Sequence, residues 1–546
     1  MFEPVPDQVG GSLVLSALCG ALPLITMFVL LGGLKMRAWL AGLISLGVAL
    51  VVAVALFEMP VDDALLSSAQ GALFSGFFPI MWIVINAVFV YNLTVHTGHF
   101  DVLRRAFSKV SDDQRIQALI IAFSFGALLE ALAGFGTPVA ITVVMLMAMG
   151  FKPVKAAAVA LIANTAPVAY GAMASPINAL STQTGFDVDT LGAMVGRQTP
   201  ILAVVVPLIL VFVVDGKRGL RQTWIPALLC GVSFGIAQFV ASNYISVPLA
   251  DIVASLVSAV VIVGLLRVWQ PSEKIRAESL VGAGSGPGAE EHEVRDSSSE
   301  IFKAFLPYAI IIVIFVIVSI PAIKDALAHR PFTLSGTDYT PTVVFPGLGD
   351  VAGAQGGIKF DWFPAAGTML LLSGIITAIC LRIRPGAVAA IYRDTYRQLA
   401  TAIVTVMAVL GLAYVMNFSG QTGSIGAWLA GAGSAFAILS PILGWLGVAV
   451  TGSDTSSNAL FGLLQVTTAK EAGLDQVLMA ASNSSGGVLG KMVSPQNLAI
   501  AAAAVGMAGK EGEIFRKVFG WSIAMLAFMC VLVALQSTPV LGWMVP

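Results

Sequence analysis

The chain carries ANTAPVAYGAMASPIN (163–178) and, 319 residues later, SNSSGGVLGKMVSPQN (482–497). Six of these sixteen aligned positions are identical: Asn164/Asn483, Gly171/Gly490, Met173/Met492, Ser175/Ser494, Pro176/Pro495 and Asn178/Asn497. Each copy interrupts a long apolar segment (154–184 and 474–504) with Gly, Pro, Ser and Asn, which free backbone groups from helical hydrogen bonds. At membrane depth such groups persist only where protein or a watery cavity satisfies them. The pair therefore predicts an internal repeat with one broken helix in each half.

The composition places the chain in a membrane. Of its 546 residues 57% are hydrophobic and only 11% are charged, and the mean hydropathy is +0.90. A soluble domain has roughly 25% charged residues. The net charge of -1 gives no basic surface for a nucleic acid, so we expect no nucleic-acid partner.

Helical crossings account for most of the chain, because about 20 apolar residues span a bilayer. We predict ten simple crossings, near 12–33, 38–57, 78–97, 190–213, 224–241, 247–268, 302–322, 362–381, 400–418 and 514–535. The two broken segments add two more. Residues 116–150, broken at AGFGTP (133–138), and 439–470, broken at TGSDTSSN (451–458), are predicted to be re-entrant hairpins.

The positive charges predict the orientation. With the N-terminus outside, 23 of the 29 Lys and Arg residues lie on the cytoplasmic side and four lie outside. The two halves then run in opposite directions, which is typical of secondary transporters. The predicted fold is an all-α polytopic membrane protein with two inverted repeats, about twelve crossings, two hairpins and both termini outside. We expect a first repeat (1–215), two connecting helices with a cytoplasmic linker (216–300) and a second repeat (301–546).

Polar residues at the breaks are the candidate binding site. Helix N-termini there attract carboxylates, and free carbonyls or hydroxyls could instead hold Na+. Capping of the half-helices is the structural alternative. The candidate substrate-binding residues are Gly136, Thr137, Asn164, Thr165, Ser453, Thr455, Ser456, Asn483, Ser484, Ser485 and Lys491.

Two intramembrane acids are candidates for proton coupling, since charged groups at this depth are costly and usually functional. Glu130 precedes AGFGTP, and Asp454 lies inside TGSDTSSN. We favour Asp454, because it lies within a break. Lys491 could attract an anionic substrate or neutralise Asp454.

The chain lacks a Walker loop, an HExxH pair and a nucleophile–His–acid set. We therefore predict neither an enzyme nor an ATP-driven pump, and neither a cofactor nor a bound metal. A membrane-embedded enzyme is the alternative from a different class.

Four motifs resemble the lactate permease family of the ion-transporter superfamily: EALAGFGTPVAITV (130–143), NTAPVAYGAMASPI (164–177), TGSDTSSNALFGLLQ (451–465) and SNSSGGVLGKMVSPQNLAIA (482–501). The resemblance covers roughly 12–540. It implies lactate and glycolate uptake by proton symport across a bacterial inner membrane. The expected partners are a small monocarboxylate, H+ and the lipid bilayer, and a homo-oligomer is among the assemblies left open. Na+-coupled uptake of a small carboxylate is the alternative.

Overall fold

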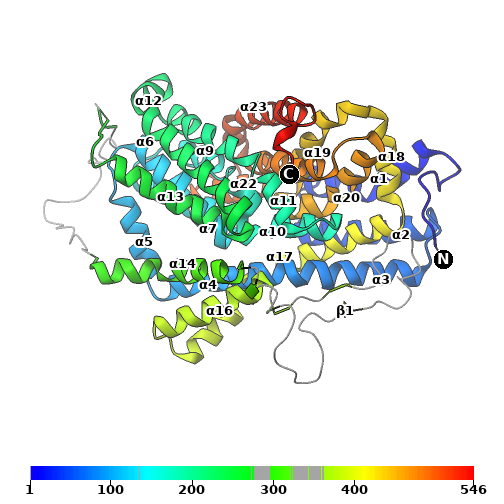
Figure 1. Ribbon diagram of the computed structural model, residues 1–546, viewed down its shortest axis with the longest axis horizontal. Coiled ribbons are helices and arrows are strands. Elements are labelled where there is room, and N and C mark those ends of the chain that lie inside the picture. The colour runs from blue at the N-terminus through cyan, green and yellow to red at the C-terminus, as the bar shows by residue number, and fades with distance from the viewer. Residues whose placement is uncertain are drawn as a thin grey trace.

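The computed structural model describes the chain apart from Met1, Phe135, Ser272, 276–295 and most of 321–364. In that last range only 322–323, 327, 342–343, 358–359 and 362–363 are described. The described residues are almost wholly helical (Figure 1), with one antiparallel pairing of two-residue strands, β1 (Thr342–Val343) and β2 (Ile358–Lys359). Most of the predicted cytoplasmic linker lies outside the described residues.

The first half and the connecting region contain helices α1 to α13, with short 3-10 or π-helical segments labelled η. Their bounds are α1 (Leu13–Phe28), η1 (Val29–Gly33), α2 (Ala38–Ala55), α3 (Val61–Gly71), η2 (Ala72–Met81), α4 (Trp82–His96), α5 (His99–Ser108), α6 (Gln114–Gln117), η3 (Ala118–Phe125), α7 (Gly126–Ala133), α8 (Thr137–Ala148), α9 (Pro153–Ala163), η4 (Val168–Tyr170), α10 (Gly171–Thr184), α11 (Val188–Val195), α12 (Thr199–Val240), η5 (Ala241–Ile245), η6 (Val247–Leu249) and α13 (Ala250–Leu265). Non-helical backbone at Asp215, Gly216 and Thr223 divides α12 into two arms.

The second half also contains a hairpin, α19–α20, followed by a helix that is broken at η9. Its bounds are α14 (Ser298–Val318), α16 (Ala366–Cys380), α17 (Pro385–Phe418), α18 (Gln421–Leu429), η8 (Ala430–Ala435), α19 (Phe436–Thr451), α20 (Asp454–Ala472), α21 (Gln476–Gly490), η9 (Lys491–Val493), α22 (Pro495–Ala504), α23 (Glu511–Gln536) and η10 (Gly542–Met544). The series α4 to α10 thus has its counterpart in α17 to α22.

Ten described helical segments are long and apolar enough to cross a membrane, or eleven if the bent pair Pro153–Ala163 and Val168–Thr184 counts as one span. An all-α polytopic membrane protein is therefore confirmed. The ten do not match our predicted crossings one to one. Gln114–Ala133 and Gln421–Thr451 contain the first arms of the predicted hairpins, and Val188–Ile245 contains two predicted crossings. The count of twelve stays a prediction.

The predicted hairpin at 116–150 folds back on itself. Its chain turns between α7 and α8, where Gly136 takes a left-handed φ of 86°. Its two ends meet, since the Gln114 side-chain amide donates to the Met149 carbonyl at 3.3 Å.

The hairpin at 439–470 has the same form. It turns at Gly452, whose φ is 76°. Gln465 on α20 donates to the Ser440 carbonyl on α19 at 3.1 Å, and Ser457 donates to the Gly444 carbonyl at 3.2 Å.

The two broken helices differ in detail. The first bends by 65° between α9 and η4–α10, where we predicted a break. In the second, α21 continues as a regular helix to Gly490, and the break falls at η9. Our expectation that Asn483, Ser484 and Ser485 sit at the break is therefore wrong, because they lie inside α21.

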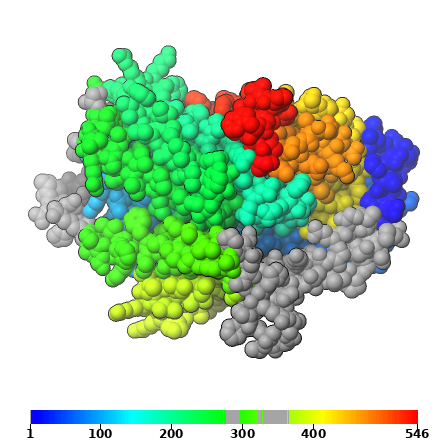
Figure 2. All heavy atoms as spheres, in the orientation of Figure 1, coloured from blue at the N-terminus to red at the C-terminus, as the bar shows by residue number. Residues whose placement is uncertain are grey.

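Long helices surround these segments. Figure 1 shows α3–α4 and α17 extending across the molecule, and they pack against each other along their length. Figure 2 shows the C-terminal residues (red) between the α12–α13 region (green) and the α19–α20 region (orange). Among these segments α7 is buried at every residue, and α21 is buried from Leu478 to Gly490.

Candidate functional site

Glu130 and Lys491 form an ion pair that joins the two halves of the chain. Lys491 Nζ lies 2.6 Å from Glu130 Oε1, and both side chains are at most 7% exposed. The Asn164 amide donates to the other oxygen, Oε2, at 3.0 Å. A hairpin of the first half thus meets both broken helices, since Asn164 ends α9 and Lys491 starts η9. Lys491 was expected to attract substrate or to neutralise Asp454, and its direct partner in this structure is Glu130.

Glycine makes room for the Glu130 carboxylate. A Cβ atom at Gly171, the first residue of α10, would lie 2.7 Å from Glu130 Oε1. Real Cβ atoms do not approach another atom so closely, so a side chain there would displace the acid. Gly171 aligns with Gly490 when the two repeated segments are compared. The Glu130 carboxylate explains why glycine is needed at position 171.

Asp454 occupies the first position of α20, directly after the N-cap Ser453. The Ser484 hydroxyl donates to Asp454 Oδ2 at 2.6 Å, whereas Oδ1 has no partner among the described residues. A Cβ atom at Gly487 would lie 2.4 Å from Oδ1. Ser484 on α21 and Lys491, which directly follows α21, are about two helical turns apart, so one helix brings the two sets of contacts together.

We call Glu130, Asn164, Asp454, Ser484 and Lys491 the polar cluster. All five side chains are buried. Two of its oxygens, Asn164 Oδ1 and Asp454 Oδ1, lack a hydrogen-bond partner among the described residues, as does the nearby Ser485 hydroxyl. Buried polar atoms are normally paired, so these three oxygens are free to accept or, for the hydroxyl, to donate a further hydrogen bond.

A series of hydrogen-bonded side-chain amides links the helices that carry the polar cluster. Gln465 donates to Asn483 at 3.0 Å, Asn483 donates to Asn458 at 2.9 Å, and Asn458 donates to the Pro176 carbonyl at 3.0 Å. The last bond connects α20 to α10 of the first half. Asn483 therefore holds the helices together, and its amide faces α20.

The other predicted site residues lie around the cluster. Thr455 approaches Ser175 of the first half at 3.4 Å, while Thr165 donates to its own helix at the Ile162 carbonyl. The Ser456 backbone is capped by Ser453. Gly136 and Thr137 form the tip of the first hairpin, near α22.

Sequence reasoning missed three buried groups: Asn458, Gln465 and Asp251. Asn458 lies in the quoted motif TGSDTSSN but was not singled out. Asp251 lies in the predicted crossing 247–268, and the rule that intramembrane acids are functional could have found it. Gln465 has no local sequence signal, because its role depends on partners elsewhere in the fold.

Two cavities lie away from the polar cluster. One of about 730 Å³ is lined by basic and tryptophan side chains at the bend of α12, and another of about 420 Å³ lies beside η5. Neither is lined by a cluster residue.

Comparisons with known proteins give one consistent match. A family model described as L-lactate permease matches residues 16–540. The L-lactate permease of Bacillus subtilis is 40% identical and that of Salmonella typhimurium 41%, each over 98% of both chains. The glycolate permease GlcA of Escherichia coli is 40% identical, again over 98% of both chains.

A search of solved structures returns two transporters among its matches. The YdaH transporter of Alcanivorax borkumensis matches with a TM-score of 0.43 and 14% identity, over 86% of both chains. MtrF of Neisseria gonorrhoeae matches with a TM-score of 0.46 and 13% identity, over 87% of this chain and 84% of that one.

Proposed function

Because the chain belongs to the L-lactate permease family, we propose that it is a secondary transporter that takes up lactate and glycolate together with a proton. The relatives supply the substrate class. The observation that carries the coupling is the buried ion pair between Lys491 and Glu130.

The ion pair links a proton to an anion through charge balance. Lys491 is held by Glu130 while that acid is ionised. A proton on Glu130 removes the opposing charge and leaves the ammonium available for a substrate carboxylate. The Lys491–Glu130 pair, counted with its ligand, is neutral in both states: either Lys+ and Glu−, or Lys+, protonated Glu and substrate−. Because uncompensated buried charge is costly, anion and proton bind together or not at all.

Because Glu130 is the acid that pairs with Lys491, we propose Glu130, and not Asp454, as the acid that carries the coupled proton. Asp454 then serves as a substrate ligand or a second acid, since one of its oxygens is unpaired. The unpaired oxygen of Asn164 faces the same cluster and suits the 2-hydroxyl group that lactate and glycolate share. A small site also favours small monocarboxylates over tricarboxylates.

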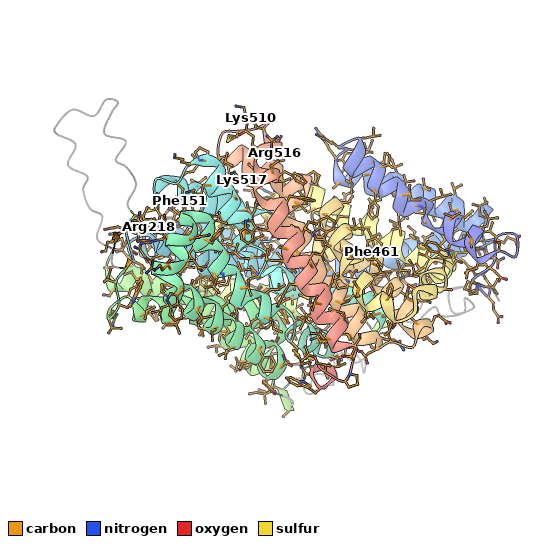
Figure 3. The ribbon with its side chains drawn as sticks, turned by 90° about the horizontal axis from the view of Figure 1, so that it is seen from above. Phe151, Arg218, Phe461, Lys510, Arg516 and Lys517 are labelled. Carbon is orange, nitrogen blue, oxygen red and sulfur yellow. The ribbon has the colours of Figure 1, made fainter. Side chains whose placement is uncertain are left out.

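The proposed orientation keeps both termini outside, in the inner membrane of a bacterium. Figure 3 shows Lys510, Arg516 and Lys517 near Phe151 at one edge of the molecule. All four lie in segments that the charge pattern assigns to the cytoplasm. Their gathering at one edge supports that assignment.

Purified protein in liposomes tests the proposal. With the outside acidified and Na+ absent, labelled lactate should accumulate unchanged, and unlabelled glycolate should compete while citrate should not. Accumulation that requires Na+ would favour the sodium-coupled alternative. Chemical conversion of the substrate without accumulation would refute transport.

A further inference from the structure

Asp251 is a buried acid that the proposed mechanism does not use. It lies in the first turn of α13, and its side chain is fully buried. Gln238 Nε2 donates to Oδ1 at 2.8 Å, while Oδ2 has no partner among the described residues. No described basic side chain forms an ion pair with it. A carboxylate without a counter-ion is costly at this depth, so Asp251 is suited to bind a proton.

The groups around Asp251 strengthen this conclusion. Glu130 on α7 acts on it electrostatically, and so does the Tyr170 phenol on η4. The neighbouring side chains of α12 that face it, Gln238 and Thr199, are neutral. Glu130 is itself paired with Lys491, so that pair adds no net charge near Asp251, and the described hydrogen-bond partner of Asp251 is the neutral Gln238 amide.

Gln238 connects Asp251 to the first broken helix. Its Nε2 also lies 3.5 Å from the carbonyl of Ala166, in the bend between α9 and α10. A hydrogen bond to a charged acceptor is roughly twice as strong as one to a neutral acceptor. Ionised Asp251 therefore holds the amide, whereas protonated Asp251 lets the Ala166 carbonyl compete for it. Ala166 is two residues after Asn164 of the polar cluster.

A row of hydroxyl groups leads from a cavity toward this site. Ser242 lines the cavity of about 420 Å³ beside η5. The Tyr170 hydroxyl donates to the Gly192 carbonyl at 2.7 Å, and it lies beside the Ser242 hydroxyl, since a Cβ atom at Gly196 would come within 2.9 Å of both. Thr199 donates to Gln238 Oε1 at 3.2 Å. Polar side chains thus lie between this cavity and the Gln238–Asp251 pair.

We propose that Asp251 is a second proton-binding site whose occupancy controls the bend between α9 and α10 through Gln238. The inference rests on the proposed proton symport. Glu130 sets whether substrate binds, and Asp251 sets how fast the loaded transporter changes shape.

The test separates affinity from rate. Lactate counterflow in liposomes is measured over a range of equal internal and external pH, in wild type and in Asp251→Asn, which mimics the protonated acid. In wild type the maximal rate should decline at high pH, where Asp251 loses its proton. In Asp251→Asn the maximal rate should not decline, while the lactate affinity should depend on pH as it does in wild type. Ser255→Ala is the matched control, because Ser255 is buried one turn along α13 and, among the described residues, its hydroxyl donates to the Ile252 carbonyl of its own helix.

A second variant and a spectroscopic signal distinguish loss of the proposed role of Asp251 from misfolding of the Asp251→Asn variant. Gln238→Leu should also give a pH-independent maximal rate, because it cuts the connection between Asp251 and the bend. Its Asp251 should still bind a proton, and this is seen as a carboxylic C=O infrared band that titrates in Gln238→Leu and is absent from Asp251→Asn. Wild-type pH dependence of the maximal rate in both variants would overturn the inference, as would loss of that dependence in Ser255→Ala. Absence of pH-driven lactate uptake in wild type would instead refute the proposed symport, and the infrared titration would still report on Asp251.

Discussion

Replacing Lys491 with Met removes the ammonium while keeping an unbranched side chain of similar length. The ammonium touches Glu130 at 2.6 Å in a site where both side chains are at most 7% exposed. Removing one partner of a buried ion pair costs about 3–5 kcal/mol when the remaining charge persists. Neutralising a glutamic acid of ordinary acidity costs about 3.7 kcal/mol at pH 7 and about 1 kcal/mol at pH 5. Protonation therefore limits the loss, and Lys491→Met should be destabilised by up to about 3.7 kcal/mol at pH 7 and much less at pH 5.

Substrate binding should fall as well. A lost hydrogen bond to a charged group costs about 1.5–3 kcal/mol, which weakens lactate affinity by about tenfold to somewhat over a hundredfold. Thermal unfolding in detergent and equilibrium binding of labelled lactate measure the two effects. Lys470→Met is the matched control, because Lys470 is exposed at the end of α20.

The double variant Glu130→Gln, Lys491→Met checks the cause. It leaves no buried charge in the pair, so it should recover most of the lost stability but none of the lost affinity. Lactate affinity within twofold of wild type in Lys491→Met would refute the role of the ammonium. A stability loss that does not change between pH 7 and pH 5 would refute the charge argument.

The remaining predictions concern other parts of the chain. Asn164→Ala should weaken lactate binding about tenfold or more by equilibrium binding, since one bond to a charged group is lost; unchanged affinity would reduce Asn164 to a helix cap. Asn483→Ala should instead lower the unfolding free energy by about 1–3 kcal/mol, because it leaves buried amides unpaired, and a pure affinity loss would contradict the supporting role. At the start of α14, the hydrogen bonds from Arg105 hold the pKa of Asp296 below its usual range. This ion pair stabilises the protein above that range and is lost as the carboxyl is protonated, so the gap in unfolding temperature between wild type and Asp296→Asn should be present at pH 7 and close below about pH 4; a gap that persists there would contradict it.

The sequence predicts the hairpins and the first broken helix because their signals are local. Gly and Pro at 134–138 and Pro167 interrupt apolar helices, and the chain bends at those places. The same reasoning placed the second break too early. Ser and Asn at 482–485 stay helical, since Ser482 donates to the Met479 carbonyl of its own helix and Asn483 bonds to Asn458 on α20. Tertiary partners outweigh weak local propensity there.

The site itself was only partly predictable. Glu130, Asp454 and Lys491 stand out because charged side chains are rare in apolar segments. Their pairing could not be inferred, because Glu130 and Lys491 are 361 residues apart and are not equivalent positions in the repeat. The role of Gly171 likewise depends on a carboxylate that approaches from another helix.

The coupling role of Glu130 is tested most directly by Glu130→Gln in liposomes. Lactate counterflow and pH-driven lactate accumulation are measured side by side, together with proton uptake per lactate. If Glu130 carries the coupled proton, the variant keeps counterflow, since the neutral amide leaves Lys491 free for substrate, but it no longer accumulates lactate against a gradient or takes up protons with it. Full pH-driven accumulation with the wild-type proton-to-lactate ratio would contradict the account.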